Sequence, residues 1–371
     1  MMLIPGPVEV PESVLKASAY VVNHRSPEFR SLVEKSERLV NKFADATATV
    51  MTTGSGTTAV ESMIYSLTSP GDSVIAATFG EFGNRLIQSL KRRGLKVAEI
   101  SKTPDDVLTV DDVDTAISRN GEAKAVFLVH NETGNGTSIH NLKEIASAIK
   151  NRGLRVYVDS VSGFGSIPIM VNKWGIDAMA TCSQKGLASV PGLGLVSLGK
   201  ELAENLKVPG DVPQYLDLDI SMNFLRKKET PFTPSTGSFS ALAKALEILD
   251  REGLERRWKR HSTNADLLRS RLSETGSSVM GIPENYSDTV IAFKPILPVA
   301  EVVERLSRNN IIVSRGMGKL SDQIVRVGNV GMVTGSQIIH FLNAYRRICG
   351  MDSIEEVRLD PVQEISREML S

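Results

Sequence analysis

The sequence predicts an α/β fold in which a mainly parallel sheet occupies the first 250 residues and a smaller α+β region follows. Two observations carry this prediction. Short, nearly continuous apolar runs alternate with amphipathic stretches through the first part of the chain, which is typical of buried parallel strands connected by covering helices. Beyond residue 250 the rhythm of the apolar runs changes, which favours a second, smaller unit.

The strands expected for the large sheet follow one another in chain order, separated by turns and helices. We expect them at residues 74–77, 97–100, 125–129, 155–159, 178–181 and 193–196, with helices at 85–93 and 142–150. Gly94 and Gly153 stand where these two helices should end. A long helical stretch at 240–272, with a break near Gly253, leads into strands at 289–293, 311–314 and 324–327 and helices at 299–307 and 336–348.

This organisation divides the chain into an N-terminal segment (1–15), a large domain (16–250) and a small C-terminal domain (251–371). The boundary near residue 250 falls inside helical sequence, so we expect no flexible linker there. In open parallel sheets, ligands bind beyond the carboxyl ends of the strands. The residues that follow each apolar run are therefore the candidates for chemistry.

Composition narrows the class of partner. The chain of 371 residues carries 43 basic and 43 acidic side chains, so its charge gives no reason to expect nucleic acid or an anionic membrane. No apolar run approaches the roughly 20 residues that span a bilayer. Two cysteines, no CxxC or HExxH spacing and scattered histidines predict no disulfide framework and no metal site. The N-terminus lacks the features of a signal peptide, so we expect a cytoplasmic protein.

A Gly-Ser-Gly-Thr-Thr-Ala run at residues 54–59 follows an apolar stretch and opens a helical pattern. It matches the G-x-G-x-x-A form of a dinucleotide-binding turn, and it equally suits a cradle of backbone N–H groups and hydroxyls for one phosphate. A dinucleotide site needs an acidic residue at the end of the next strand, where this sequence has Thr78 and Phe79. We therefore favour a single phosphate, while a helix start without a ligand stays open.

Asp159 and Lys185 each follow an apolar run that should form a buried strand. A carboxylate at such a strand end is costly unless it faces a cation or a protonated ring nitrogen, or caps the following turn. A lysine beside glycine at a strand end can lose its proton through partial burial and act as a nucleophile, although most lysines lie on the surface. Taken singly, each residue leaves both interpretations open.

The strand-end segments gain meaning from their order. They are the Gly-Ser-Gly-Thr turn at 54–57, the aromatic Phe82, His-Asn-Glu-Thr at 130–133, Asp159, and Ser-Gln-Lys at 183–185. This ordered set resembles the class V aminotransferases, pyridoxal-phosphate enzymes of fold type I, and within them the alanine–glyoxylate and serine–pyruvate/glyoxylate branch. The resemblance runs from Pro-Gly-Pro at residues 5–7 to Val-Arg-Val-Gly at 325–328. It implies a seven-stranded sheet in the large domain and an N-terminal segment near the active-site entrance.

The resemblance also implies roles for matching residues. Lys185 would hold pyridoxal 5′-phosphate as a Schiff base and shuttle protons, while Asp159 would keep the ring nitrogen protonated. The other implied cofactor contacts are Ser55, Gly56, Thr57 and Gln184 at the phosphate, Phe82 stacked on the ring, Thr133 near the ring hydroxyl, Val161 beneath the ring and Thr233 from a neighbouring subunit. Arg326 and Gly6 would bind the substrate, with Arg326 holding its α-carboxylate as a fork. The match at Thr233 implies a homodimer with composite active sites.

These roles describe an aminotransferase that moves the amino group of serine or alanine to glyoxylate or pyruvate by a ping-pong mechanism. Aminoethylphosphonate–pyruvate or aspartate transamination is an alternative on the same fold. A cysteine desulfurase or related lyase would need a mobile thiol, and neither Cys182, expected on a strand, nor Cys349, at a helix end, is well placed. A degenerate binding protein is a further alternative, against which the intact Lys185, Asp159 and Gln184 argue.

Overall fold

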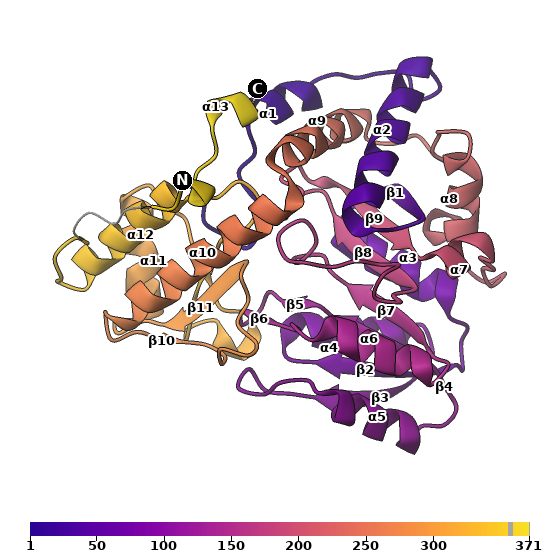
Figure 1. The fold of residues 1–371 in the computed structure, drawn as a ribbon, viewed down its shortest axis with the longest axis horizontal. Coiled ribbons are helices and arrows are strands. Elements are labelled where there is room, and N and C mark those ends of the chain that lie inside the picture. The colour runs from indigo at the N-terminus through magenta and orange to yellow at the C-terminus, as the bar shows by residue number, and fades with distance from the viewer. Residues whose placement is uncertain (355–358, 371) are drawn as a thin grey trace.

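The computed structural model describes residues 1–354 and 359–370 and contains two main sheets, each covered by helices (Figure 1). The larger sheet has seven strands in the order β1-β9-β8-β7-β4-β2-β3. Their bounds are Ala48–Gly54 (β1), Ser73–Thr78 (β2), Lys96–Ser101 (β3), Ala123–Val129 (β4), Arg155–Asp159 (β7), Ala178–Cys182 (β8) and Gly192–Leu198 (β9). Strand β9 runs antiparallel to both β1 and β8, and the pairs from β8 to β3 are parallel. The predicted α/β fold with a mainly parallel seven-stranded sheet is confirmed.

Helices bury apolar faces against this sheet, which is why its central strands can be apolar throughout. Helix α4 shows the pattern, since Leu86, Ile87 and Leu90 are buried and Leu90 lies four and three residues after the other two. The helices of this part are α1 (Glu12–Ser18), α2 (Pro27–Ala44), α3 (Gly56–Leu67), α4 (Glu81–Arg92), α5 (Val110–Arg119), α6 (Leu142–Asn151), α7 (Lys200–Glu204), α8 (Leu218–Leu225) and α9 (Thr236–Glu252), with a 3₁₀ turn at Gln214–Leu216. Strands β5 (Asn131–Glu132) and β6 (Thr137–Ser138) form a small ladder beyond β4.

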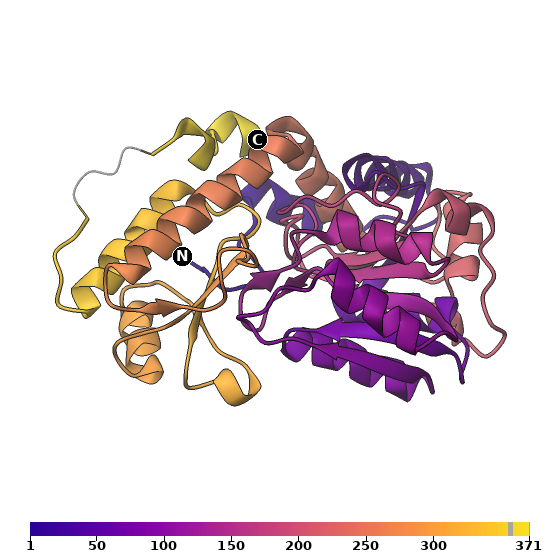
Figure 2. The ribbon, with the colours of Figure 1, turned by 60° about the horizontal axis from the view of Figure 1, so that its bottom comes forward.

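The C-terminal part has its own antiparallel sheet and apolar core (Figure 2). The sheet order is β10-β11-β13-β12, with strands Ser278–Val279 (β10), Val290–Lys294 (β11), Ser314–Arg315 (β12) and Val325–Gly328 (β13). Its helices are α10 (Leu254–Ser273), α11 (Val299–Arg308), α12 (Gly335–Ile348) and α13 (Arg367–Leu370), with 3₁₀ turns at Gly318–Leu320 and Pro361–Gln363. Phe293 and Phe341 both pack on Tyr345 at the centre of the core. The division into domains near residue 250 stays a prediction.

Most predicted elements differ from the structure by one or two residues at their ends, and three differ by three or four, among them the long helical stretch expected from residue 240, which begins at Thr236. The strand expected at 311–314 is wrong in extent, because β12 is Ser314–Arg315 and Ile312 pairs with the start of the chain instead. Leu3 donates its N–H to the Ile312 carbonyl at 2.8 Å, so the N-terminal segment takes the place of a longer strand. The helix expected at 85–93 begins at Glu81, before Phe82. The break near Gly253 is confirmed, since this residue separates α9 from α10 with a φ of 79°.

Within the described residues, every helix is too short or too polar to cross a lipid bilayer.

Candidate active site

Three neighbouring strands end at the same edge of the large sheet and deliver five of the twelve predicted site residues: Thr133, Asp159, Val161, Gln184 and Lys185. Strand β7 lies between β4 and β8, with Asp159 aligned with Val129 on one side and Ala180 on the other. The segment that holds Thr133 follows β4, and the segment that holds Lys185 follows β8. Because the carboxyl ends of parallel strands share one edge, these side chains meet there.

Lys185 is partly buried and faces this edge. Its Nζ donates to Thr133 Oγ1 at 3.5 Å and lies 5.5 Å from the centroid of the Phe82 ring. Loss of hydration on burial lowers the pKa of Lys185, and the nearby Arg326 charge acts in the same direction, against Asp159 and Glu132. A lowered pKa increases the neutral fraction of the amine, which is the form that attacks a carbonyl carbon.

Asp159 is buried and lines a pocket formed by the start of α3, the start of α4 and the end of β7. Val161 N–H donates to its Oδ1 at 2.9 Å. Burial raises the pKa of Asp159, against the Val161 hydrogen bond and the charges of Lys185 and Arg85. The pocket is lined by Gly56, Thr57, Val60, Glu61, Phe82, Arg85, Leu86, Ser89, Asp159 and Val161.

The predicted phosphate cradle lies at the start of α3, beside the same pocket. Ser55 is the N-cap residue, and its N–H donates to Thr58 Oγ1 at 3.2 Å. A Cβ on Gly56 would lie 2.7 Å from both methyl carbons of Val161, so only glycine fits between the helix and this side chain. The macrodipole and free N–H groups of α3 favour an anion. Gln184 is partly exposed and accepts a hydrogen bond from Ser183 Oγ at 3.3 Å.

Phe82 and Thr133 are held in place by the segment beyond β4. The buried Glu132 carboxylate accepts hydrogen bonds from the backbone N–H groups of Phe82, Gly83 and Gly134 at 2.8 to 3.2 Å. Burial raises the pKa of Glu132, against these three hydrogen bonds. Thr133 Oγ1 donates to Ser162 Oγ at 2.8 Å. Glu132 therefore fixes the position of Phe82 in the first turn of α4.

Arg326 reaches the same edge from the other sheet. Its Nε donates to the Arg315 carbonyl at 2.8 Å and its Nη1 to the Thr133 carbonyl at 2.9 Å. Burial lowers the pKa of Arg326, against the charge of Glu132. Among the described residues, Nη2 has no hydrogen-bond partner and is the donor that a ligand can use.

The N-terminal segment closes the site over Lys185. Gly6 has a φ of 121°, which favours glycine, and a Cβ there would lie 3.0 Å from Lys185 Cγ. The same segment is tied on both sides, because Leu3 O accepts from Gly328 N–H at 2.8 Å and Val8 N–H donates to Gln184 O at 3.2 Å. The structure thus brings together eleven of the twelve predicted site residues: Gly6, Ser55, Gly56, Thr57, Phe82, Thr133, Asp159, Val161, Gln184, Lys185 and Arg326.

Thr233 is the exception within one chain. It lines a different pocket, with Met51, Thr52, Thr53, Tyr215, Thr230, Pro231, Phe232 and Pro234.

No role was predicted from the sequence for two residues of the site, Glu132 and Arg85. Glu132 carries the same signal as Asp159, an acidic residue after a buried strand. Arg85, which lies 5.3 Å from the Phe82 ring centroid, carries no such signal because it reads as the polar face of a helix.

The family model for aminotransferase class-V matches residues 13–330, which is most of the chain. The chain belongs to the class V aminotransferase family. Among curated relatives, an uncharacterized aminotransferase of Methanocaldococcus jannaschii is 32% identical over 91% of this chain and 90% of its own length. A serine–glyoxylate aminotransferase of Methylorubrum extorquens is 29% identical over 89% of this chain and 86% of its own.

A solved structure agrees with this membership. The alanine–glyoxylate aminotransferase of a Nostoc species superposes with a TM-score of 0.88 at 29% identity, covering 94% of each chain. The predicted class V aminotransferase family and its pyridoxal-phosphate fold type I are confirmed. The roles of the individual site residues stay predictions.

Proposed function

We propose that the protein is a pyridoxal-phosphate-dependent aminotransferase that moves the amino group of serine or alanine to glyoxylate or pyruvate in a ping-pong reaction. One observation carries the proposal. Phe82 faces the same pocket as Asp159 and lies within 5.5 Å of Lys185 Nζ, so an acid and an amine flank one aromatic side chain. The names of the relatives support transfer to glyoxylate.

The residues present fit the cofactor. Between Phe82 and Val161 the pocket has apolar walls that suit a flat ring, and the start of α3 suits its phosphate. The second oxygen of Asp159 is the acceptor that would keep a ring nitrogen protonated. Lys185 would hold the cofactor's aldehyde carbon, and Thr133 would contact its hydroxyl. When bound, pyridoxal phosphate supplies an electron sink for the carbanion formed at the substrate Cα.

The chain's own groups handle the proton and the substrate. Lys185 Nζ, whose pKa burial lowers, would take the proton from the substrate Cα and deliver it to the cofactor carbon that receives the amino group, with Thr133 Oγ1 orienting the amine. Arg326 Nη2 holds the α-carboxylate by a charge-assisted hydrogen bond, while its other contacts fix the guanidinium. The absence of a side chain at Gly6 leaves room for the lysine stem.

We also propose a homodimer in which Thr233 reaches the partner's cofactor phosphate. The segment around Thr233 exposes apolar rings: Tyr215 and Phe232 stack at 5.5 Å between ring centroids and are 43% and 38% exposed. Exposed apolar patches of this kind mark protein contacts. Co-expression of Lys185→Ala and Thr233→Ala chains tests this arrangement, because composite sites restore one good site in each mixed dimer. Absence of any restored activity would contradict the shared site.

A half-reaction screen tests the donor. The yellow protein is mixed with serine, alanine, aspartate or aminoethylphosphonate, and the loss of visible absorbance is followed. Serine or alanine should react fastest, and glyoxylate or pyruvate should restore the colour, as a ping-pong reaction requires. Faster bleaching by aspartate or aminoethylphosphonate would replace the proposed donor and keep the reaction class.

The desulfurase alternative finds no support at either sulfur. Cys182 is buried on β8, where its Sγ donates to the Val161 carbonyl at 3.8 Å. Burial raises the pKa of the Cys182 thiol to about 11, so the reactive thiolate is scarce at neutral pH. Cys349 lies at the end of α12, away from the site strands. A sulfide-release assay with cysteine should therefore give no signal.

A further inference from the structure

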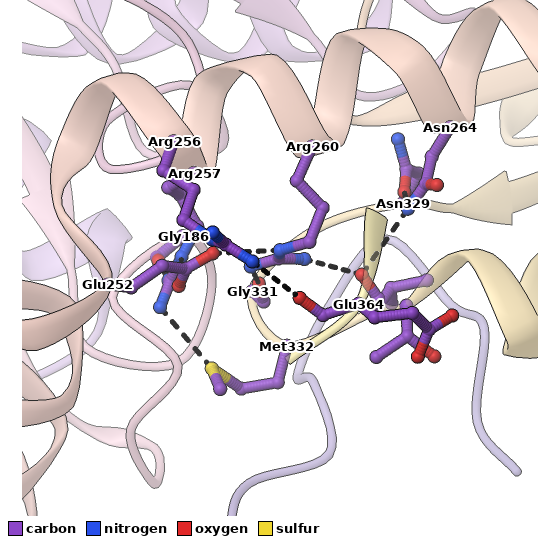
Figure 3. Close-up of polar contacts among 12 residues, drawn as sticks. Gly186, Glu252, Arg256, Arg257, Arg260, Asn264, Asn329, Gly331, Met332 and Glu364 are labelled. Atoms are coloured by element: carbon purple, nitrogen blue, oxygen red, sulfur yellow. Dashed lines mark hydrogen bonds and ion pairs between the residues drawn. The ribbon is translucent and has the colours of Figure 1, made fainter. Parts of the chain in front are cut away.

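A buried ion triad lies where α9 meets α10 and contacts a loop that follows a strand of each main sheet (Figure 3). Glu252, the last residue of α9, places its carboxylate between two arginines of α10: Oε2 lies 2.5 Å from Arg257 Nε and Oε1 lies 2.8 Å from Arg260 Nε. The exposed fractions are 5%, 0% and 0%, so the three charges are removed from water. The charges and hydrogen bonds of the two arginines hold the pKa of Glu252 below its ordinary value despite burial.

The outer ends of the two guanidinium groups bind backbone carbonyls of two different loops. Arg257 Nη1 donates to the carbonyl of Gly186, the residue that follows Lys185, at 3.0 Å. Arg260 Nη2 donates to the carbonyl of Gly331 at 3.0 Å, and its Nη1 donates to the carbonyl of Val333. Gly331 and Val333 follow β13, the strand that holds Arg326.

The two loops also approach each other directly. A Cβ built on Gly331 would lie 3.3 Å from the carbonyl oxygen of Lys185. The polar network continues on the β13 side, because Asn329 Nδ2 donates to the carbonyls of His261 and Asp288. One carboxylate thus couples the loop of the predicted cofactor lysine to the loop of the predicted carboxylate-binding arginine.

Stability alone is a weak reason for such a triad. The free energy lost when buried ions give up their hydration is often as large as the attraction between them. Apolar residues of similar volume can therefore replace such pairs without loss of stability. Their geometric specificity is greater, since an arginine fork accepts its partners only in a fixed plane. The triad is therefore suited to fixing a position.

We propose that Arg257 and Arg260, joined by Glu252, are positioning residues that set the Lys185 amine at the correct separation from the Arg326 guanidinium. The inference rests on the proposed function. In an α-amino acid the amino group and the carboxylate are attached to one carbon. The protein groups that bind them, Lys185 and Arg326, must therefore be held at a fixed separation. A displacement of about 1 Å at a reacting centre costs on the order of 100-fold in rate.

The test compares alanine with ethylamine, which has the same amino carbon and no carboxylate. Arg257→Lys keeps the charge and loses the fork that spans Glu252 and Gly186. We expect the rate of the visible absorbance change on mixing to fall about 100-fold with alanine and to change little with ethylamine, which does not use Arg326. Equal losses with both amines would show a merely structural role and overturn the proposal.

The matched control is Arg256→Lys. Arg256 is the neighbouring arginine of α10, and it donates to the carbonyls of Pro361 and Glu364 rather than to either site loop. It should leave the ratio of alanine to ethylamine rates unchanged. If Arg257→Lys folds poorly, the triple variant Glu252→Gln, Arg257→Met and Arg260→Met removes all three charges together and keeps similar volumes. A triple variant that retains the wild-type ratio would also overturn the proposal.

Hydrogen exchange in the cofactor-free protein gives a second measurement, which does not depend on activity. Arg257→Lys should speed amide exchange in residues 186–189 and also in residues 329–334 across the junction, whereas Arg256→Lys should affect neither. Faster exchange confined to residues 186–189 would show that the loops are not coupled. A wild-type protein that ignores both pyridoxal phosphate and alanine would sink the proposed function, and the exchange experiment would still test the coupling.

Discussion

His130 should make the protein acid-labile, in a pH range set by its burial. The side chain is 3% exposed, and its Nδ1 lies 2.9 Å from Ser160 Oγ. Loss of hydration, with a smaller contribution from His140, lowers the pKa of His130 from 6.5 to about 3. A group with a depressed folded-state pKa stabilises the fold fully above its unfolded pKa and loses that contribution as the pH falls toward the folded value.

The magnitude follows from this difference in pKa. While the folded histidine stays neutral, the free energy of unfolding falls by about 1.4 kcal/mol for each pH unit below the unfolded pKa. Between pH 8 and pH 5 the wild type should therefore lose about 2 kcal/mol of stability through His130. His130→Gln removes the titration, so its free energy of unfolding should fall by about 2 kcal/mol less than that of the wild type between these two pH values.

Urea unfolding of both proteins at pH 8 and pH 5 measures the effect, with His140→Gln as control because His140 is exposed and bonds through Nε2 to the Tyr286 carbonyl. The buried His261, whose pKa also lies well below its ordinary value because of burial, contributes equally to wild type and variant and cancels. A His130→Gln protein that loses as much stability as the wild type on acidification would refute the reasoning.

Three further predictions concern the site itself. Lys185→Ala should abolish the visible absorbance of bound pyridoxal phosphate, and a retained band would contradict the lysine assignment. Gly56→Ala places a methyl group 2.7 Å from Val161 and should lower the melting temperature, at a cost of about 1–3 kcal/mol. Gly121→Ala, with open space around the added methyl, should not, and Val161→Ala should rescue Gly56→Ala if the clash is the cause. Glu132→Leu leaves three backbone N–H groups of the site unpaired and should destabilise the protein by about 1–3 kcal/mol for each group that stays buried; unchanged stability by calorimetry would show that water replaces the carboxylate.

Of the seven strands of the large sheet, the threonine-rich β1 was not located from the sequence. The sequence was sufficient for the other six because most of them are apolar runs separated by clear turns. The run at 125–129, for example, lies inside β4 as expected. The start of α4 was not predictable locally. Phe82-Gly83 lowers helix propensity, and the carboxylate that satisfies the first N–H groups is Glu132, fifty residues later. Local patterns also could not show that the N-terminus pairs with Ile312.

The candidate site divides in the same way. Lys185 and Asp159 could be predicted from the sequence because each places a charge at the end of a buried strand, where charged residues are unusual. Arg257 and Arg260 break no rule that sequence reveals, since arginines three residues apart on a helix predict a solvated face. Their burial depends on Glu252 and on carbonyls from two distant loops, which only the tertiary structure brings together.

The N-terminal segment at residues 3–8 determines when, during folding, the pocket can form. It is pinned to Gly328 on one side and to Gln184 on the other, so the beginning, the middle and the far end of the chain must all be present before the pocket exists. Such long-range closure is slow and comes late in folding. A chain still being synthesised would therefore lack a complete pocket for the proposed pyridoxal phosphate. The visible absorbance of the bound cofactor should then appear only when folding is complete.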